Sequence, residues 1–344
     1  MKPGNRSRGI TLIELLVSIS IGLVVVGAMV ALYIATARGY RQFDALAQLQ
    51  SNARYVFEIM GYDIRMAGNM SCHVPWHPKP TNFIADYNSR WWSNTDRPLL
   101  GIKEGADGNA KKDAGFPAEY GDDALRGDSV IVLRANPDEK SSGIVASYGS
   151  GSPDPIQLES GKFEPGDLLL LTDCRTTSSV FQVSGDKGGI GHGTELSSSV
   201  AGPLDMAGAK LVQLSANAYY LRESPYAYAS SRQKIPSLYR QALVTIGGLA
   251  TTRAEELVSG VTDLQIRYGV DENGDGVLDR YVDANAVTAW EQVTAVRVTI
   301  TLETTDDAVA TESSRFTLGN GSTITDRRLR RSYTATFGLR ERLS

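Results

Sequence analysis

Residues 9–37 read GITLIELLVSISIGLVVVGAMVALYIATA, and this stretch decides the fold. From 10 to 37 it holds 28 residues and one charge, Glu14. At about 1.5 Å per residue a helix of this length reaches ~42 Å, whereas the hydrocarbon core of a bilayer is about 30 Å thick. The leader before it, residues 1–9, is basic, and basic flanks stay cytoplasmic. The sequence therefore predicts one membrane-spanning helix with a cytoplasmic N-terminus.

A cleaved secretory signal is the alternative for the same stretch. Ala35-Thr36-Ala37 offers a small-x-small cleavage site. The apolar run is, however, longer than a signal-peptide core, and it contains the carboxylate of Glu14. A charge at the centre of a membrane helix costs ~2.5–3.5 kcal/mol, so its presence favours a function in which Glu14 meets a positive partner.

The segment Gly9-Ile-Thr-Leu-Ile-Glu14-Leu-Leu-Val resembles the processing site of type IV prepilins. The resemblance implies that prepilin peptidase cuts between Gly9 and Ile10 and methylates the new N-terminus on Ile10, although the family usually has Phe at that position. It also implies that Glu14 is the glutamate at the fifth mature position. The amine of one subunit can then neutralise Glu14 of its neighbour inside the apolar filament core, where an unpaired charge is costly.

The helix is expected to continue to about Ala67, with Gly68-Asn69 as the stop. Apolar residues recur in steps of three and four, which predicts a buried stripe of Tyr40, Phe43, Ala47, Ala53, Phe57, Met60, Ile64 and Ala67. The opposite face is polar and is expected to face solvent, at Arg41, Asp44, Gln48, Arg54, Glu58 and Arg65.

The remaining residues, 68–344, are expected to form a β-rich head. Residues 68–127 are rich in Pro, Gly, Trp and Asn, which indicates loops. Strands are predicted at 129–134, 167–172, 180–183, 211–221 and 238–246, and strictly alternating strands at 264–270, 296–302 and 333–339. The fold class is therefore α+β and type IV pilin-like: a long N-terminal helix packed on a large antiparallel head. Two lobes are possible, with a boundary near 141–152.

The C-terminal third is similar to the PilW family of minor pilins. The similarity lies in 258–279, reading VSGVTDLQIRYGVDENGDGVLD, in 290–301, and in the ending of 327–343, TATFGLRERL. It implies a low-abundance subunit that primes pilus assembly and sits at or near the tip, supporting adhesion and twitching motility. The implied partners are other minor pilins, the major pilin, a tip-associated adhesin, prepilin peptidase and an inner-membrane assembly platform. The implied location is the inner membrane before assembly and the pilus afterwards.

A candidate calcium site lies within the C-terminal third. The run Asp271-Glu-Asn273-Gly-Asp275-Gly-Val277-Leu-Asp279 matches the first nine positions of a calcium loop, with oxygen ligands at positions one, three, five, seven and nine. Its twelfth position, Val282, lacks the usual bidentate carboxylate. The alternative is a hairpin turn rich in Asn-Gly and Asp-Gly that needs no metal. The prediction is that Ca²⁺ binds Asp271, Asn273, Asp275, Val277 and Asp279, with no other cofactor.

The only two cysteines, Cys72 and Cys174, are far apart and outside any CxxC spacing, so one disulfide is expected in an oxidising compartment. Arginines 327, 328, 330 and 331 are expected to line a solvated strand edge rather than to bind DNA or lipid. The net charge of −4 gives no reason to expect a nucleic-acid partner. Because no GxSxG, HExxH or Cys/His catalytic pattern occurs, an enzyme is not expected.

Two other functions remain open. The chain could be a minor pseudopilin of a type II secretion system, resembling the J subunit. It could also be a membrane-tethered calcium-binding or adhesive receptor that never polymerises, in which case Glu14 would have no role.

Overall fold

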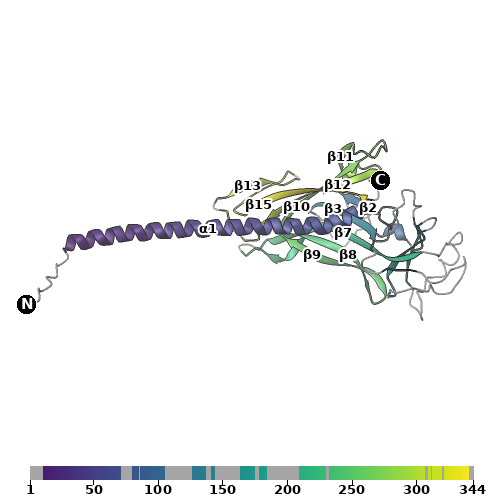
Figure 1. Ribbon diagram of the computed structural model, residues 1–344, viewed down its shortest axis with the longest axis horizontal. Helices are drawn as coiled ribbons and strands as arrows, with labels where there is room; N and C mark the ends of the chain where they lie inside the picture. The colour runs from purple at the N-terminus through teal and green to yellow at the C-terminus, as the bar shows by residue number, and fades with distance from the viewer. Residues whose placement is uncertain are drawn as a thin grey trace, which may run out of the picture.

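The computed structural model describes residues 11–70, 80–84, 86–104, 126–136, 141–143, 163–174, 178–183, 209–229, 232–306, 309–310, 312–319 and 321–340. One long helix carries a β-rich head on its C-terminal half, while its N-terminal half projects away from the head (Figure 1). The predicted α+β, pilin-like fold is thereby confirmed.

Helix α1 spans Leu12–Arg65, which is 54 residues. At about 1.5 Å per residue it is ~81 Å long. The chain leaves the helix at Gly68, whose φ of 77° is the left-handed conformation that glycine adopts readily at helix ends. The Gly68 N–H donates to the Leu133 carbonyl at 2.9 Å, so the chain turns directly onto the head. The predicted stop is correct, and the helix itself ends two residues before Ala67.

A four-stranded antiparallel sheet has the order β11-β10-β12-β15. Its strands are β10 (Val261–Val270), β11 (Arg280–Asp283), β12 (Val293–Glu303) and β15 (Arg330–Gly338). The apolar residues that alternate along β10 and β12 are fully buried on one face, as the period of two predicts: Leu264, Ile266, Tyr268, Val296, Val298 and Ile300.

The second sheet has nine strands joined through β7. They are β1 (Thr81–Asn82), β2 (Leu99–Ile102), β3 (Arg126–Ala135), β4 (Ser141–Gly143), β5 (Leu168–Thr172), β6 (Ser178–Gln182), β7 (Lys210–Ala227), β8 (Lys234–Ile246) and β9 (Leu249–Ser259). The first residues of β7 pair with β4 and β5, and its later residues pair with β3 and β8. The strands β13 (Ser314–Thr317) and β14 (Thr323–Asp326) form a separate small hairpin. Short 3-10 helices lie at Tyr87–Ser89, Ala284–Ala286 and Trp290–Gln292.

The main core lies where α1 meets both sheets. Val56, Met60 and Ile64 have no exposed surface, and they pack with residues of β10, β12, β15, β3 and β7. Gly61 makes the close approach possible, because a Cβ at this position would lie 2.4 Å from the Phe337 ring. The C-terminal half of α1 is therefore an integral part of the head.

The predicted buried stripe is correct from Ala53 onward and wrong before it. Tyr40 and Phe43 are 72% and 73% exposed, and Ala47 is also exposed. The buried core begins at Leu49, which is 3% exposed. Nearer the N-terminus the head still contacts α1, where the Gln42 amide donates to the Val309 carbonyl at 3.2 Å, but Tyr40 and Phe43 stay exposed. The predicted polar face is exposed at Arg41, Asp44, Gln48, Arg54 and Glu58, and half-buried at Arg65.

The predicted loop region 68–127 also contains two strands that the pattern missed, β1, which pairs with β6, and β2, which pairs with β3. In the proposed lobe boundary, residues 141–143 form β4, paired with β7, and residues 144–152 lie outside the described residues. Whether the head has two lobes stays a prediction.

Candidate functional site

The N-terminus of α1 is closed by Thr11 and Glu14. The Glu14 N–H donates to the Thr11 hydroxyl at 3.3 Å, and the Thr11 N–H donates to the Glu14 carboxylate at 3.1 Å. This reciprocal pair is a capping box. Both residues follow the predicted cleavage point, so the cap would persist in a processed chain. The cap keeps the Glu14 carboxylate at the tip of the helix.

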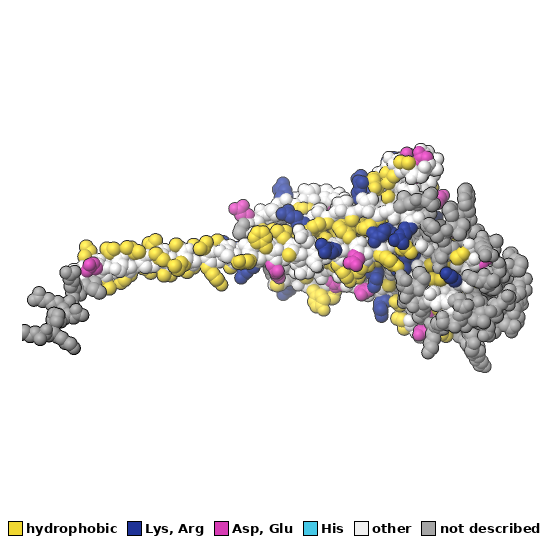
Figure 2. Space-filling view, in the orientation of Figure 1, with side chains coloured by type: hydrophobic (Ala, Val, Ile, Leu, Met, Phe, Trp, Pro, Cys, Tyr) yellow, Lys and Arg dark blue, Asp and Glu magenta, His cyan; other side chains and the backbone are white. Residues whose placement is uncertain are grey.

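Apolar side chains surround the projecting half of α1. Leu12, Val24 and Leu32 are 77%, 72% and 69% exposed. Figure 2 shows these yellow side chains covering the length of helix outside the head. By length and composition α1 is long and apolar enough to cross a membrane, and the most apolar window is not buried at all. This surface needs an apolar environment that the chain itself does not supply.

Gly9 and Ile10 lie outside the described residues. The cleavage between them, and the methylation of Ile10, stay predictions. The predicted partner of Glu14 in a filament, the Ile10 amine of a neighbour, belongs to the same prediction.

A buried polar cluster fastens the other end of α1 to the head. Asp63, 3% exposed, accepts from the Arg134 Nε at 2.8 Å on β3. It also accepts from the Asn217 amide and the Tyr219 hydroxyl, both at 2.6 Å, on β7. Burial and the nearby Asp63 carboxylate raise the pKa of Tyr219 well above its usual value. Sequence reasoning missed this cluster, because its members are up to 156 positions apart.

The candidate calcium loop joins β10 to β11. Asp271 is 7% exposed, and its two oxygens accept the Gly274 and Gly276 N–H groups at 2.7 and 2.8 Å. Asp279 accepts the Glu272 N–H at 2.8 Å. The loop therefore holds its shape through its own backbone, with Gly274 and Gly276 both at positive φ.

Within the described part of the chain, no three His, Cys, Asp or Glu side chains are grouped closely enough to hold a metal ion. The three aspartates of the loop thus share one turn without converging on one point. Asn273 and the Val277 carbonyl, the other two candidate ligands, lie in the same turn, where Asn273 accepts the Asp275 N–H at 2.9 Å. The calcium site stays a prediction.

Cys174 follows β5 with a φ of 56°, in the left-handed region. Cys72 lies outside the described residues. The disulfide between them is therefore also a prediction.

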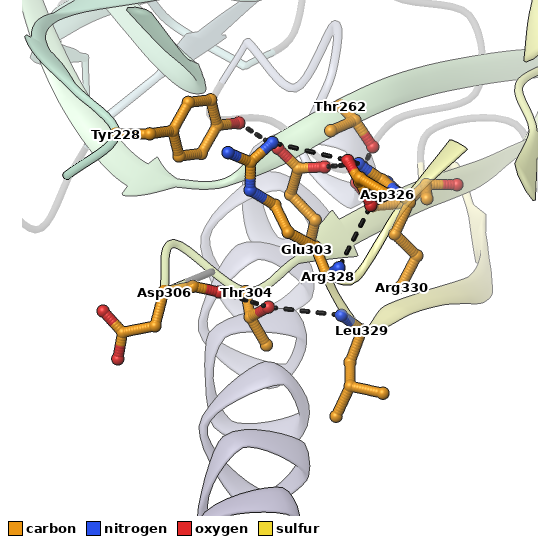
Figure 3. Close-up of polar contacts among 10 residues, drawn as sticks. Tyr228, Thr262, Glu303, Thr304, Asp306, Asp326, Arg328, Leu329 and Arg330 are labelled. Atoms are coloured by element: carbon orange, nitrogen blue, oxygen red, sulfur yellow. Dashed lines mark hydrogen bonds and ion pairs between the residues drawn. The ribbon is translucent and has the colours of Figure 1, made fainter. Parts of the chain in front are cut away.

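The predicted solvated arginine edge is wrong for two of its four members. Arg330 is 7% exposed and forms two 2.7 Å bonds to the Asp326 carboxylate and an ion pair with Glu303. Arg328 is 8% exposed and stacks 3.5 Å above the Tyr228 ring, and the Tyr228 hydroxyl donates to Glu303 (Figure 3). Only Arg327 and Arg331 are exposed. Opposite charges brought together by the fold explain the burial.

This buried charge cluster joins three segments of the head: the loop after β7, the end of β12 and the turn between β14 and β15 (Figure 3). Burial and the Glu303 carboxylate raise the pKa of Tyr228. Together with β13 and β14 it borders a cavity of about 390 Å³ that is also lined by Glu104 and Asp263. The cluster ties the hairpin to the head.

Comparison with known families supports the reading of the N-terminus and of the C-terminal third. Residues 4–30 match the family described as the prokaryotic N-terminal methylation motif. Residues 218–341, which run from within β7 past the end of β15, match the family described as type IV pilus-assembly protein W. No curated protein and no solved structure gives a significant match.

The methylation motif, the long apolar helix and the antiparallel head fit one class of protein, the type IV pilin-like subunits that are anchored in a membrane and enter a pilus. Within that class the C-terminal region is of the PilW type, and the resemblance predicted from the sequence is confirmed. In its N-terminus and its C-terminal third the chain is thus similar to type IV pilin-like minor pilins of pilus assembly.

Proposed function

We propose that this chain is a low-abundance subunit that primes type IV pilus assembly with other minor pilins and remains at or near the pilus tip. The observation that carries the proposal is the division of α1, whose C-terminal half is fixed in the head and whose apolar N-terminal half is left for other molecules. The tip position, with its role in adhesion and twitching motility, is supported by the resemblance to PilW.

The proposed sequence of events starts in the inner membrane, with residues 1–9 in the cytoplasm. Prepilin peptidase removes this leader and methylates Ile10. The assembly platform then moves α1 from lipid into the filament, where Glu14 pairs with the amine of a neighbouring subunit. Other minor pilins, the major pilin and a tip-associated adhesin are the proposed partners, and neither nucleic acid nor a catalytic reaction is part of the proposal.

Two other functions make different demands on the chain. A J-like pseudopilin would use the same helix in a secretion filament, so deleting the gene would reduce exoprotein secretion and leave surface pili intact. A tethered receptor would need the anchor alone and would be indifferent to the charge at Glu14. Loss of pili with normal secretion is the result that our proposal expects.

The first experiment is the intact mass of the protein taken from membranes with and without prepilin peptidase, followed by N-terminal fragmentation. We expect loss of residues 1–9 and one methyl group on Ile10 when the peptidase is present. An unprocessed chain, or one cut after Ala37, would overturn the assembly role and favour the tethered or secreted receptor.

A further inference from the structure

Strand β15 is an edge of the four-stranded sheet, and its register shows which of its backbone groups are left without a partner. The Leu339 N–H donates to the Thr294 carbonyl, and the Thr304 N–H donates to the Leu329 carbonyl. Both bonds continue the β12–β15 register, in which the residue number falls by one on β15 for every residue gained on β12. Because antiparallel strands bond at every second residue, the backbone N–H and C=O groups of the odd-numbered residues of β15 point toward β12.

The even-numbered residues therefore direct their N–H and C=O groups away from the sheet. Ser332, Thr334 and Thr336 are all exposed. Their hydroxyls contact Thr301, Thr299 and Arg297 on the solvent face of the sheet. Their outward backbone groups bond to no residue that the structure describes. Three amide donors thus stand in a row along one edge.

This edge lacks the features that normally protect a free strand. Such edges are blunted by charges, proline, bulges or short length. Residues 332–337 read SYTATF, uncharged and without proline, and the pairing of β15 has no register shift. By contrast, the edge strand β9 carries Arg253, Glu255 and Glu256 and a bulge in its pairing, and β11 has only four residues, two of them charged.

The arginines that would guard this edge are turned elsewhere. Arg328 and Arg330 lie directly before the uncharged run, where they would discourage strand pairing if they were solvated. Instead both are held in the buried charge cluster, with Glu303 and Asp326. Arg331 is the one exposed charge that remains on β15, and the run that follows it, residues 332–336, carries no charge.

We propose that the β15 edge is a strand-addition site that accepts an extended, uncharged segment of another pilin-like subunit, whose backbone extends the sheet by one strand. Backbone hydrogen bonds would supply the affinity, as in other complexes formed by strand addition. The inference rests on the proposed function, because β15 lies alongside α1, the element through which subunits assemble (Figure 1).

A different subunit fits this edge better than a second copy of this chain. Two β15 edges pairing antiparallel would direct their two α1 helices in opposite directions, since β15 runs along α1 (Figure 1). Subunits anchored in one membrane with the same orientation do not allow this. An antiparallel pair of two copies is thereby excluded, and the occupant that we assign is an extended segment of a different subunit.

The direct test is hydrogen exchange at single amides of the full-length chain, first alone in detergent and then in filaments recovered from cells. The inward amides of Tyr333, Ala335 and Phe337 should be protected in both states and serve as the internal reference. The outward amides of Ser332, Thr334 and Thr336 should exchange fast alone and at least about tenfold more slowly in filaments. Fast exchange of the outward amides in filaments would overturn the proposal.

The matched variants are Thr334→Pro and Thr334→Val. Both remove the hydroxyl that contacts Thr299, but only proline removes the outward N–H, and an edge strand tolerates proline where the N–H faces solvent. We expect incorporation to fall severalfold for Thr334→Pro at an unchanged melting temperature, and to stay normal for Thr334→Val. Equal incorporation of the two folded variants would contradict strand addition.

Two further readouts separate this inference from the proposed function. If Glu14→Ala abolishes incorporation and Thr334→Pro does not, the pilin role stands and the strand-addition site is wrong. If neither variant changes incorporation, both proposals fail. If the purified chain dimerises and Thr334→Pro makes it monomeric, the edge pairs with its own copy, which overturns the assignment to a different subunit.

Discussion

The two halves of α1 have the same backbone geometry and opposite surroundings. In the C-terminal half, Val56, Met60 and Ile64 are wholly buried against the two sheets, whereas Leu12, Val24 and Leu32 in the N-terminal half are exposed. Each apolar side chain of this size left in water forgoes about 1.5–3 kcal/mol. One half is therefore stable as part of the head, and the other depends on lipid and later on neighbouring subunits.

The charged residues of the two halves differ in the same way. Asp63 has its cation, Arg134, within the chain at 2.8 Å. Among the residues that the structure describes, Glu14 bonds to Thr11, the cap of its own helix. A carboxylate whose partner lies in the same fold contributes to folding, whereas one whose partner lies in another subunit contributes to assembly.

The strongest test of this difference is Glu14→Gln beside Glu14→Ala. Glutamine keeps the cap of α1 but loses the charge, so both variants should lower incorporation into sheared filaments by at least about tenfold, because breaking a buried pair costs several kcal/mol. Membrane insertion should persist or improve, because a desolvated charge is removed. Equal amounts of mutant and wild type in sheared filaments would contradict a role for the charge.

At the other end of the helix, Asp63→Ala should destabilise the head by about 3–5 kcal/mol, because it leaves Arg134 buried without a counter-charge. The melting temperature of the full chain in detergent should fall by about 6–20 °C. Glu58→Ala, one turn earlier on the exposed face, is the control and should stay within about 0.5 kcal/mol. A stable Asp63→Ala protein would mean that apolar packing alone holds the helix.

The disulfide predicted between Cys72 and Cys174 would add to the stability of the head. Its loss in a Cys174→Ser variant should cost about 2–4 kcal/mol, since a disulfide restricts the unfolded chain. The measurement is thiol titration of the purified, unfolded and unreduced protein, which should find no free thiol. Two titratable thiols would refute the bridge.

The contact of the C-terminal half of α1 with the head should also weaken at alkaline pH, because it includes Tyr219. The pKa of Tyr219 is raised in the folded head, so above about pH 10 the unfolded chain releases a proton that the folded chain keeps. The contribution of Tyr219 to the free energy of unfolding is thus fully present below about pH 10 and declines above it. Tyr219→Phe should reduce the slope of this decline by about 1.4 kcal/mol per pH unit. Tyr226→Phe, whose side chain is 71% exposed and stays in water in both states, should leave the slope unchanged.

The limits of sequence reasoning follow the same division between local and distant contacts. The apolar run, the strand alternation and the stop at Gly68 are local patterns, and each was predicted correctly. Tyr40 and Phe43 continue the apolar spacing, but only the fold reveals that the buried core begins at Leu49. A pattern along the helix contains no information about how far the head extends.

Charged residues were harder to place. Asp63 and Arg330 look like surface residues in the sequence, since a lone charge is normally solvated. Their partners are brought to them by strands far away in the chain, β3 and β7 for Asp63 and the end of β12 for Arg330. A sequence pattern of fixed spacing cannot reveal such pairs.

The smallest expected effect concerns the β10–β11 loop, which contacts neither half of α1. If Ca²⁺ binds there, a concentration ten times the dissociation constant should add about 1.4 kcal/mol to the free energy of unfolding. The melting temperature would rise by about 3–6 °C. Asp275→Asn and Asp279→Asn should abolish the rise, because each removes a predicted ligand charge.

Glu272→Gln is the matched control within the same loop, because Glu272 pairs with Arg280 and occupies no ligand position. It should keep the full response to Ca²⁺. Asp271 and Asp279 already accept backbone N–H groups of the loop. If millimolar Ca²⁺ produces neither calorimetric heat nor a melting shift, the loop is a hairpin turn held by its own hydrogen bonds, and the head folds without a metal.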